Sequence, residues 1–192
     1  IRDIVRARLK RLSPGCADAL GAAGVLGDSF EVAVLAAVTD SDEHDLQRIL
    51  DEVAEAGLVE EVSAGRYRFA HRLTRDAVYA GLGPGRRARL HAAAATALAE
   101  QHGLEPGRRL GEIALHRCEA AGEAGDTEAV DLAAAAAAIA MDEGAYEQAV
   151  ALLTRALGVV PDGDVERRRS IAGQRARAFA RLTHAILDTP AG

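Results

Sequence analysis

Phosphate chemistry of the P-loop type depends on one lysine placed after glycine and before serine or threonine. The ammonium group of that lysine must reach the β- and γ-phosphates of the nucleotide. The only lysine among the 192 residues is Lys10, which lies between Leu9 and Arg11. This chain therefore cannot bind and hydrolyse a nucleotide by that route on its own.

Metal ligands and nucleophiles also lack a productive spacing. His116 and Cys118 are two residues apart, which places them on different faces of a helix. Four further histidines have no ligand-like spacing to each other: His44, His91, His102 and His184. Serine, histidine and aspartate occur without a Gly-x-Ser-x-Gly context. We therefore expect no metal site and no catalytic residue, so the chain is not predicted to be an enzyme.

Two segments of opposite charge stand out. Residues 40–56 carry seven acids and one base, Arg48. Residues 66–91 carry seven arginines against one acid, Asp76, and six of these arginines form a candidate interaction surface: Arg66, Arg68, Arg75, Arg86, Arg87 and Arg89. An arginine band of this kind suits nucleic acid, a nucleotide-bearing core or an acidic partner, or is a solvated face in an arginine-rich protein.

The elements that must position these residues are expected to be mainly helical. Aromatic residues make up only 3% of the chain, so the core must come from Leu, Val, Ile and Ala, which favours closely packed helices. The longest apolar run, residues 132–141, is about half the length of a membrane-spanning helix. Two cysteines cannot form a disulfide framework, so we expect a cytoplasmic protein without a membrane role. A helical pattern already under way at Ile1 suggests a piece of a longer protein.

Capping residues and spacing predict several short helices in the first region. Ser13-Pro14 starts a helix with an N-cap and a proline at the first helical position. Residues 30–38 are expected to form a short apolar helix, and Ser41 is expected to cap the next one, which ends at Gly57. Further helices follow at residues 73–80 and after Pro84.

One β-hairpin is predicted at residues 58–70. Two short runs are joined by Ser63-Ala64-Gly65, with glycine where a positive φ is needed. In the second run Tyr67 and Phe69 share one face. Three helices followed by a two-stranded wing is the pattern of a winged helix, and we expect this domain to span residues 1–103.

The region 104–192 is predicted to be helical throughout. Segments at 110–121, 127–142, 146–157 and 165–187 are separated by glycine-rich breaks, which predicts antiparallel helical hairpins. Residues 130–161 resemble one tetratricopeptide (TPR) repeat. The resemblance rests on Gly144, Tyr146, Ala149, Ala156 and Pro161: the alanines let two helices approach, Tyr146 fills the mouth of the hairpin, and Pro161 stops the second helix.

The order of several short motifs is more specific. They are Arg11-Leu12-Ser13-Pro14, Gly24-Val25-Leu26-Gly27, Ala56-Gly57-Leu58-Val59, Tyr67-Arg68-Phe69-Ala70-His71, Arg75-Asp76-Ala77-Val78-Tyr79, and Arg87 with Leu90-His91. Together they resemble the segment after the NTPase core in STAND-class (AAA/NB-ARC-like) ATPases, especially LuxR-type transcriptional regulators of actinobacteria. In that family a P-loop core precedes a winged helix, a TPR-like array and often a helix-turn-helix.

The resemblance implies a regulatory arm rather than an enzyme. His71 is similar to the histidine of the family's Met-His-Asp signature, which touches the β-phosphate of ADP and holds the closed state. Ala70 replaces the methionine and Arg72 replaces the aspartate, so His71 and Arg72 are candidate phosphate contacts only when the core is present. The alternative is a capping histidine with no ligand. No cofactor is expected in this fragment; ATP or ADP would bind the parent protein.

The implied partners are the upstream NTPase domain, a protein or small-molecule inducer on the helical array, and further copies of the protein. Two alternatives stay open. The arm could bind DNA through its arginine-rich wing, although an acidic third helix would be repelled by the phosphates of a duplex. The same arm could also follow the ATPase core of a cyclase- or kinase-linked protein.

Overall fold

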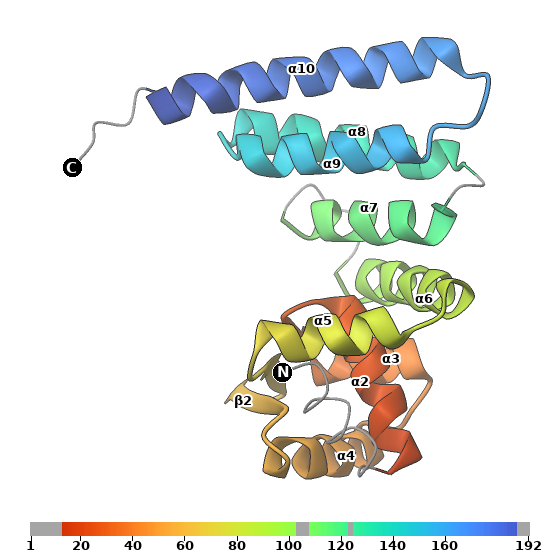
Figure 1. Cartoon of the computed structure of the whole chain (residues 1–192), viewed down its shortest axis with the longest axis vertical. Helices are drawn as coiled ribbons and strands as arrows, with labels where there is room; N and C mark the ends of the chain where they lie inside the picture. The colour runs from red at the N-terminus through yellow and green to blue at the C-terminus, as the bar shows by residue number, and fades with distance from the viewer. Residues whose placement is uncertain (1–12, 103–107, 123–124, 188–192) are drawn as a thin grey trace. The chain divides into compact units, whose positions relative to one another are not determined.

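The computed structural model describes residues 13–102, 108–122 and 125–187, so the helix expected from Ile1 lies outside the described part. The described chain is mainly helical with one small antiparallel sheet, as predicted (Figure 1). It divides into two compact units, Ile1–Ala97 and Leu98–Gly192. This division falls within helix α6, a few residues before residue 103, where we expected the boundary.

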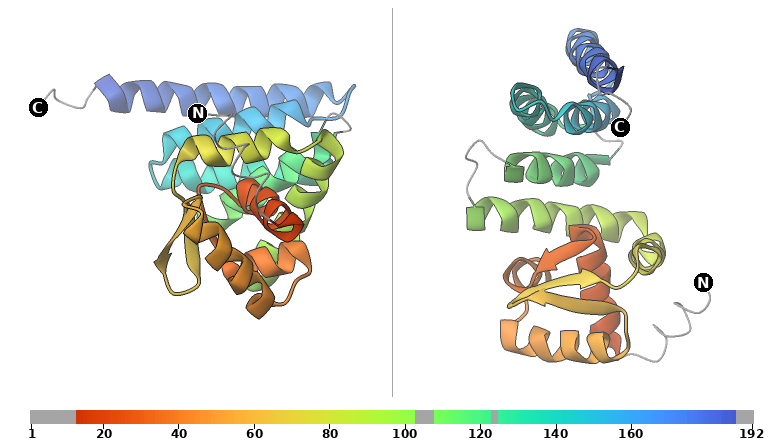
Figure 2. Two further views of the ribbon diagram at one scale, coloured as in Figure 1. Left: turned by 60° about the horizontal axis from the view of Figure 1, so that its bottom comes forward. Right: turned by 90° about the vertical axis from the view of Figure 1, so that its left-hand side faces the viewer.

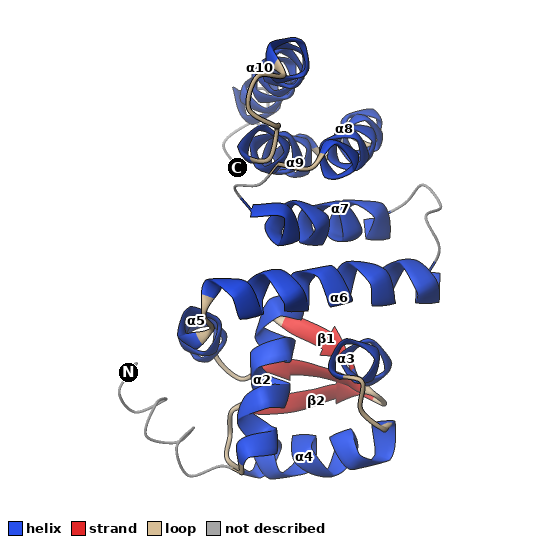
Figure 3. Cartoon of the chain, turned by 90° about the vertical axis from the view of Figure 1, so that its right-hand side faces the viewer, coloured by secondary structure: helices blue, strands red, loops and turns tan. Residues whose placement is uncertain are grey.

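The first unit has the element order of a winged helix. Helices α2, α3 and α4 are followed by the β2–β3 hairpin, which forms the wing (Figure 3). The bounds are α2 (Pro14–Leu26), β1 (Ser29–Glu31), α3 (Val32–Thr39), α4 (Glu43–Glu55), β2 (Val59–Ser63), β3 (Arg66–Phe69), α5 (Arg72–Gly81) and α6 (Pro84–His102).

The sheet has three strands rather than the two that were predicted. β3 lies between β1 and β2 and is antiparallel to both (Figure 2). Phe30 pairs with Tyr67 across β1 and β3, and their stacked rings have centroids 6.2 Å apart. The prediction of a helix from residue 30 was therefore wrong for Phe30 and Glu31. Their extended conformation depends on pairing with a strand more than thirty residues away, which local spacing does not reveal.

The structure shows which residue caps α4 and which side chains of the wing are buried. Asp42, not Ser41, caps α4: its carboxylate accepts hydrogen bonds from the backbone of His44 and Asp45. The aspartate is better placed because it directly precedes the first helical residue. In the wing Tyr67 and Phe69 lie on one face of β3, as predicted, and both are buried.

The second unit consists of helices that reverse direction at each short turn. The helices α7 (Arg108–Ala121), α8 (Thr127–Asp142), α9 (Tyr146–Gly158) and α10 (Val165–Leu187) match the four predicted segments closely. The colour gradient of Figure 1 shows α8, α9 and α10 running alternately in opposite directions. α9 packs against both α8 and α10.

Alanine-rich packing forms the core of this unit. Ala133, Ala137, Ala149 and Ala156 are almost fully buried, so α8 and α9 approach closely. Leu152 and Leu153 fill the space between the helices. The fold class is therefore the expected one: a winged helix with a small sheet, followed by α-hairpins.

Candidate functional site

The start of α5 holds the two residues that were predicted to contact phosphate. His71 is the N-cap of α5 with an extended backbone (φ −143°, ψ 133°), and Arg72 is the first helical residue. The carbonyl of His71 accepts a hydrogen bond from the backbone N–H of Thr74 at 2.8 Å, but its imidazole makes no capping bond. Both side chains are exposed. His71 therefore caps the helix through its backbone and leaves its ring available.

The predicted arginine surface does not form one patch of equivalent side chains. Arg68 pairs with Glu60 across the wing at 2.6 Å, and Arg86 pairs with Asp18 at 2.6 Å. Within the described chain, Arg66 and Arg89 are exposed and have no ion pair. The two remaining members, Arg75 and Arg87, turn inward.

Arg75 and Arg87 converge on the ring of Tyr79. Their guanidinium carbons lie 5.1 Å and 4.8 Å from its centroid, within the range of a cation–π interaction. Arg75 Nε also donates to the carbonyl of Gly24 at 2.9 Å, and Arg87 Nε donates to the carbonyl of Leu82 at 3.1 Å. These two arginines therefore join helices within the first unit and are only partly exposed.

Sequence reasoning missed the role of Tyr79. Its spacing of four residues from Arg75 on one helix would have suggested a contact between the two side chains. The approach of Arg87 from α6 depends on the path of the chain through the turn between α5 and α6. The sequence indicated where this turn lies but not its geometry. The group that results is a packing centre rather than an open site.

The acidic segment lies on the exposed surface of α4. Glu43, Asp45, Asp51 and Glu52 are all exposed, and Arg48 is engaged by Asp45. In the winged-helix order α4 is the third helix, the one that a DNA-binding member would insert into the major groove. Its carboxylates would meet the phosphates of the duplex directly.

The residues of the predicted repeat have different roles in the second unit. Gly144 has a positive φ of 77° in the turn between α8 and α9, and Ala149 and Ala156 are fully buried. Pro161 follows the end of α9 and packs on Gly125. Tyr146 begins α9 but is only half-buried, so it closes the hairpin less completely than we expected.

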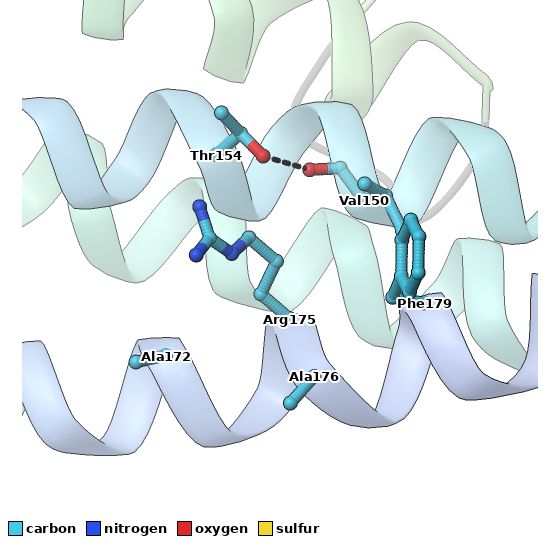
Figure 4. Close-up of a pocket in the computed structure, with 6 residues that line it drawn as sticks. All are labelled: Val150, Thr154, Ala172, Arg175, Ala176 and Phe179. Carbon is cyan, nitrogen blue, oxygen red and sulfur yellow. Dashed lines mark hydrogen bonds between the residues drawn. The ribbon is translucent and has the colours of Figure 1, made fainter.

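A groove between α9 and α10 is the larger of two hollows described in the second unit, with a volume of about 440 Å³. Val150 and Thr154 line it from α9, and Ala172, Arg175, Ala176 and Phe179 line it from α10 (Figure 4). Figure 4 shows Arg175 and Phe179 both reaching from α10 toward α9. A second hollow, of about 230 Å³, is lined mainly by α8, with Leu153 of α9 and with Gln174 and Arg177 of α10.

His116 and Cys118 are both buried in α7. Burial lowers the pKa of His116 from 6.5 to about 4 and raises the pKa of Cys118 from 9.0 to about 11. A neutral imidazole and a protonated thiol are the forms that a hydrophobic core favours. Among the described residues, no three His, Cys, Asp or Glu side chains are grouped as a metal site would require.

Within the same described part of the chain, no helix has the length and apolar character needed to cross a bilayer. The chain matches none of the protein-family models, curated proteins or solved structures with which it was compared.

Proposed function

We propose that this chain is a non-catalytic relay and protein-interaction segment of a STAND-type, ATP-dependent transcriptional regulator in the cytoplasm. It couples an upstream NTPase core to a helical sensor array. The observation that carries the proposal is the exposure of His71 and Arg72 at the start of α5, immediately after the wing. Both side chains are free to meet a surface outside the winged-helix unit.

In the closed state, the start of α5 faces ADP held by the core. The imidazole of His71 and the guanidinium of Arg72 donate hydrogen bonds to phosphate oxygens. The positive end of the α5 helix dipole adds to the positive potential there. Exchange of ADP for ATP, or an inducer on the helical array, releases the arm and permits self-assembly.

The winged-helix unit is assigned to protein contact in preference to DNA reading because of the charges on α4. A recognition helix needs basic or neutral side chains on its exposed face. Here that face carries the exposed carboxylates of Glu43, Asp45, Asp51 and Glu52. Of the two arginines on the β3 strand of the wing, Arg68 is paired with Glu60. Duplex binding with a steep dependence on salt would favour the DNA reading.

The test uses the full-length regulator with the substitution His71→Ala or Arg72→Ala. We expect faster release of ADP and a higher basal activity, because each change removes a donor to phosphate. Arg181→Ala on α10 is the control, because Arg181 is also exposed and without an ion pair in the described chain but lies outside the predicted arginine surface. Rates of ADP release that match the unsubstituted protein for all three variants would overturn the phosphate contact.

A further inference from the structure

An exposed apolar stripe runs along α10. Val165, Phe179 and Ile186 are 61%, 60% and 62% exposed, and they are spaced in multiples of seven residues. Ala172, which is partly buried, occupies the intervening position of this repeat. A repeat of seven keeps these side chains on one face of the 23-residue helix, which is the pattern by which one helix packs along another.

This stripe is separate from the face that α10 already buries. Ile171 and Ala178, also seven residues apart, are almost fully buried. Each lies one position before Ala172 or Phe179, so the two stripes are about 100° apart around the helix. α10 therefore packs against α9 with one stripe and leaves the other without a partner in the described part of the chain.

The groove between α9 and α10 lies beside the exposed stripe. Phe179 lies at the edge of the groove, opposite Val150 (Figure 4). Ala172 and Ala176 also line the groove from α10, and their side chains are small. The hydroxyl of Thr154 donates a hydrogen bond to the backbone carbonyl of Val150 at 2.7 Å, so this donor is already satisfied. The groove is apolar apart from the guanidinium of Arg175.

The arginines of α10 indicate that its partner is acidic. Arg169 and Arg175 lie three residues on either side of Ala172, so they flank the stripe; both are exposed, and neither has an ion pair among the described residues. Arg177 and Arg181 are also exposed but lie on the opposite face of the helix. Arg167 differs, because Asp164 and Asp131 engage it. Two unpaired cations beside an apolar face are complementary to a surface that carries carboxylates.

We propose that the exposed stripe of α10 and the adjoining groove bind an acidic amphipathic helix of a partner protein. Apolar side chains of that helix, seven residues apart, pack on Phe179 and Ile186, and a carboxylate pairs with Arg175. A second copy of α10 is a poorer occupant, because its own arginines would repel those of the first. Nucleic acid would leave the apolar stripe uncovered.

The inference deepens the proposed function, because it gives the helical array a partner. Its test involves neither nucleotide nor an NTPase core, so the two proposals can fail separately.

The probe is a synthetic 21-residue helical peptide with leucine at every seventh position, flanking glutamates and one tryptophan. The chain itself contains no tryptophan, so emission reports the peptide alone. A matched peptide carries lysine in place of glutamate. We expect the acidic peptide to bind at least about tenfold more tightly than the lysine peptide at physiological salt.

Substitutions on α10 locate the site. Phe179→Ser and Arg175→Glu should each weaken binding at least about fivefold. Arg181→Glu is the control, because it makes the same charge change on a different face of the same helix. Arg181 is two residues from Phe179, which corresponds to a rotation of about 200° around the helix axis. It should change affinity less than about twofold. The lysine peptide should regain binding to the Arg175→Glu variant, which also shows that this variant is folded.

Four results would overturn the inference. They are no binding of the acidic peptide, equal weakening by Arg175→Glu and Arg181→Glu, a dimer in light scattering that Phe179→Ser dissociates, and displacement of the peptide by a DNA or RNA duplex at physiological salt.

Discussion

The hydroxyl of Tyr79 lies 3.0 Å from Nε2 of His91 and joins helix α5 to helix α6. The two rings meet edge to face with centroids 5.9 Å apart. His91 is only 5% exposed, so its polar atoms are largely withdrawn from water. Arg75 and Arg87 hold the ring of Tyr79 in place, which makes this tyrosine a structural centre of the winged-helix unit.

Removal of the Tyr79 hydroxyl should destabilise the first unit. Tyr79→Phe keeps the ring and its cation–π contacts but leaves His91 without this hydrogen bond. We expect the free energy of unfolding to fall by about 1 kcal/mol, measured by urea denaturation. Tyr146→Phe is the control, since the Tyr146 hydroxyl makes no hydrogen bond within the described chain. An equal loss in both variants would contradict the role given to Tyr79.

Gly125 should tolerate a methyl group less well than Gly144, although both have a φ of 77°. A Cβ atom on Gly125 would lie 2.9 Å from Cα of Pro161, whereas one on Gly144 would have no neighbour within 4 Å. Gly144→Ala should therefore cost only the strain of the left-handed backbone, about 1 kcal/mol. Gly125→Ala should cost at least about 1 kcal/mol more, because backbone atoms must move.

The two glycine variants are compared by thermal or urea denaturation of the second unit in the full chain. Equal stability losses would mean that Pro161 does not pack against the turn at Gly125. That result would remove one of the contacts that close the predicted repeat.

The buried imidazole of His116 should make stability depend on pH. Its pKa is lowered from 6.5 to about 4 by burial, so the unfolded chain takes up a proton near pH 6.5 and the folded chain does not. Between these values the unfolded state binds more protons. The contribution of His116 to stability is therefore complete above pH 6.5 and is lost as the pH falls toward 4, by about 3 kcal/mol.

The measurement is the slope of the unfolding free energy against pH between 7 and 4.5. His116→Gln should flatten this slope relative to the unsubstituted chain, whatever its effect at pH 7. His184→Gln is the control, because His184 is exposed on α10. Parallel slopes for the chain and the His116→Gln variant would show that the imidazole does not stay neutral in the folded state.

Local signals predicted most of the fold. Glycine and proline breaks, with helical spacing between them, located α7 to α10 to within about two residues. The alternation of Tyr67 and Phe69 gave the buried face of the wing. β1 was missed because Phe30 becomes extended only through its pairing with Tyr67, and such long-range pairing leaves no local pattern.

The candidate sites were less accessible to sequence reasoning. Charge counting found the arginine band but could not tell that Arg75 and Arg87 turn toward Tyr79 while Arg66 stays in solvent. The stripe of Val165, Phe179 and Ile186 is visible in the sequence as a spacing. Only the packing of Ile171 and Ala178 shows that a different face of α10 is the one already buried.

Calorimetric titration of the 192-residue chain with ADP tests most directly whether nucleotide binding requires the NTPase core. A relay arm that contacts phosphate only together with an NTPase core should give no binding heat up to millimolar ADP, and no turnover of ATP. Tight binding of ADP by the chain alone would contradict that account, because it would place a complete nucleotide site within these residues.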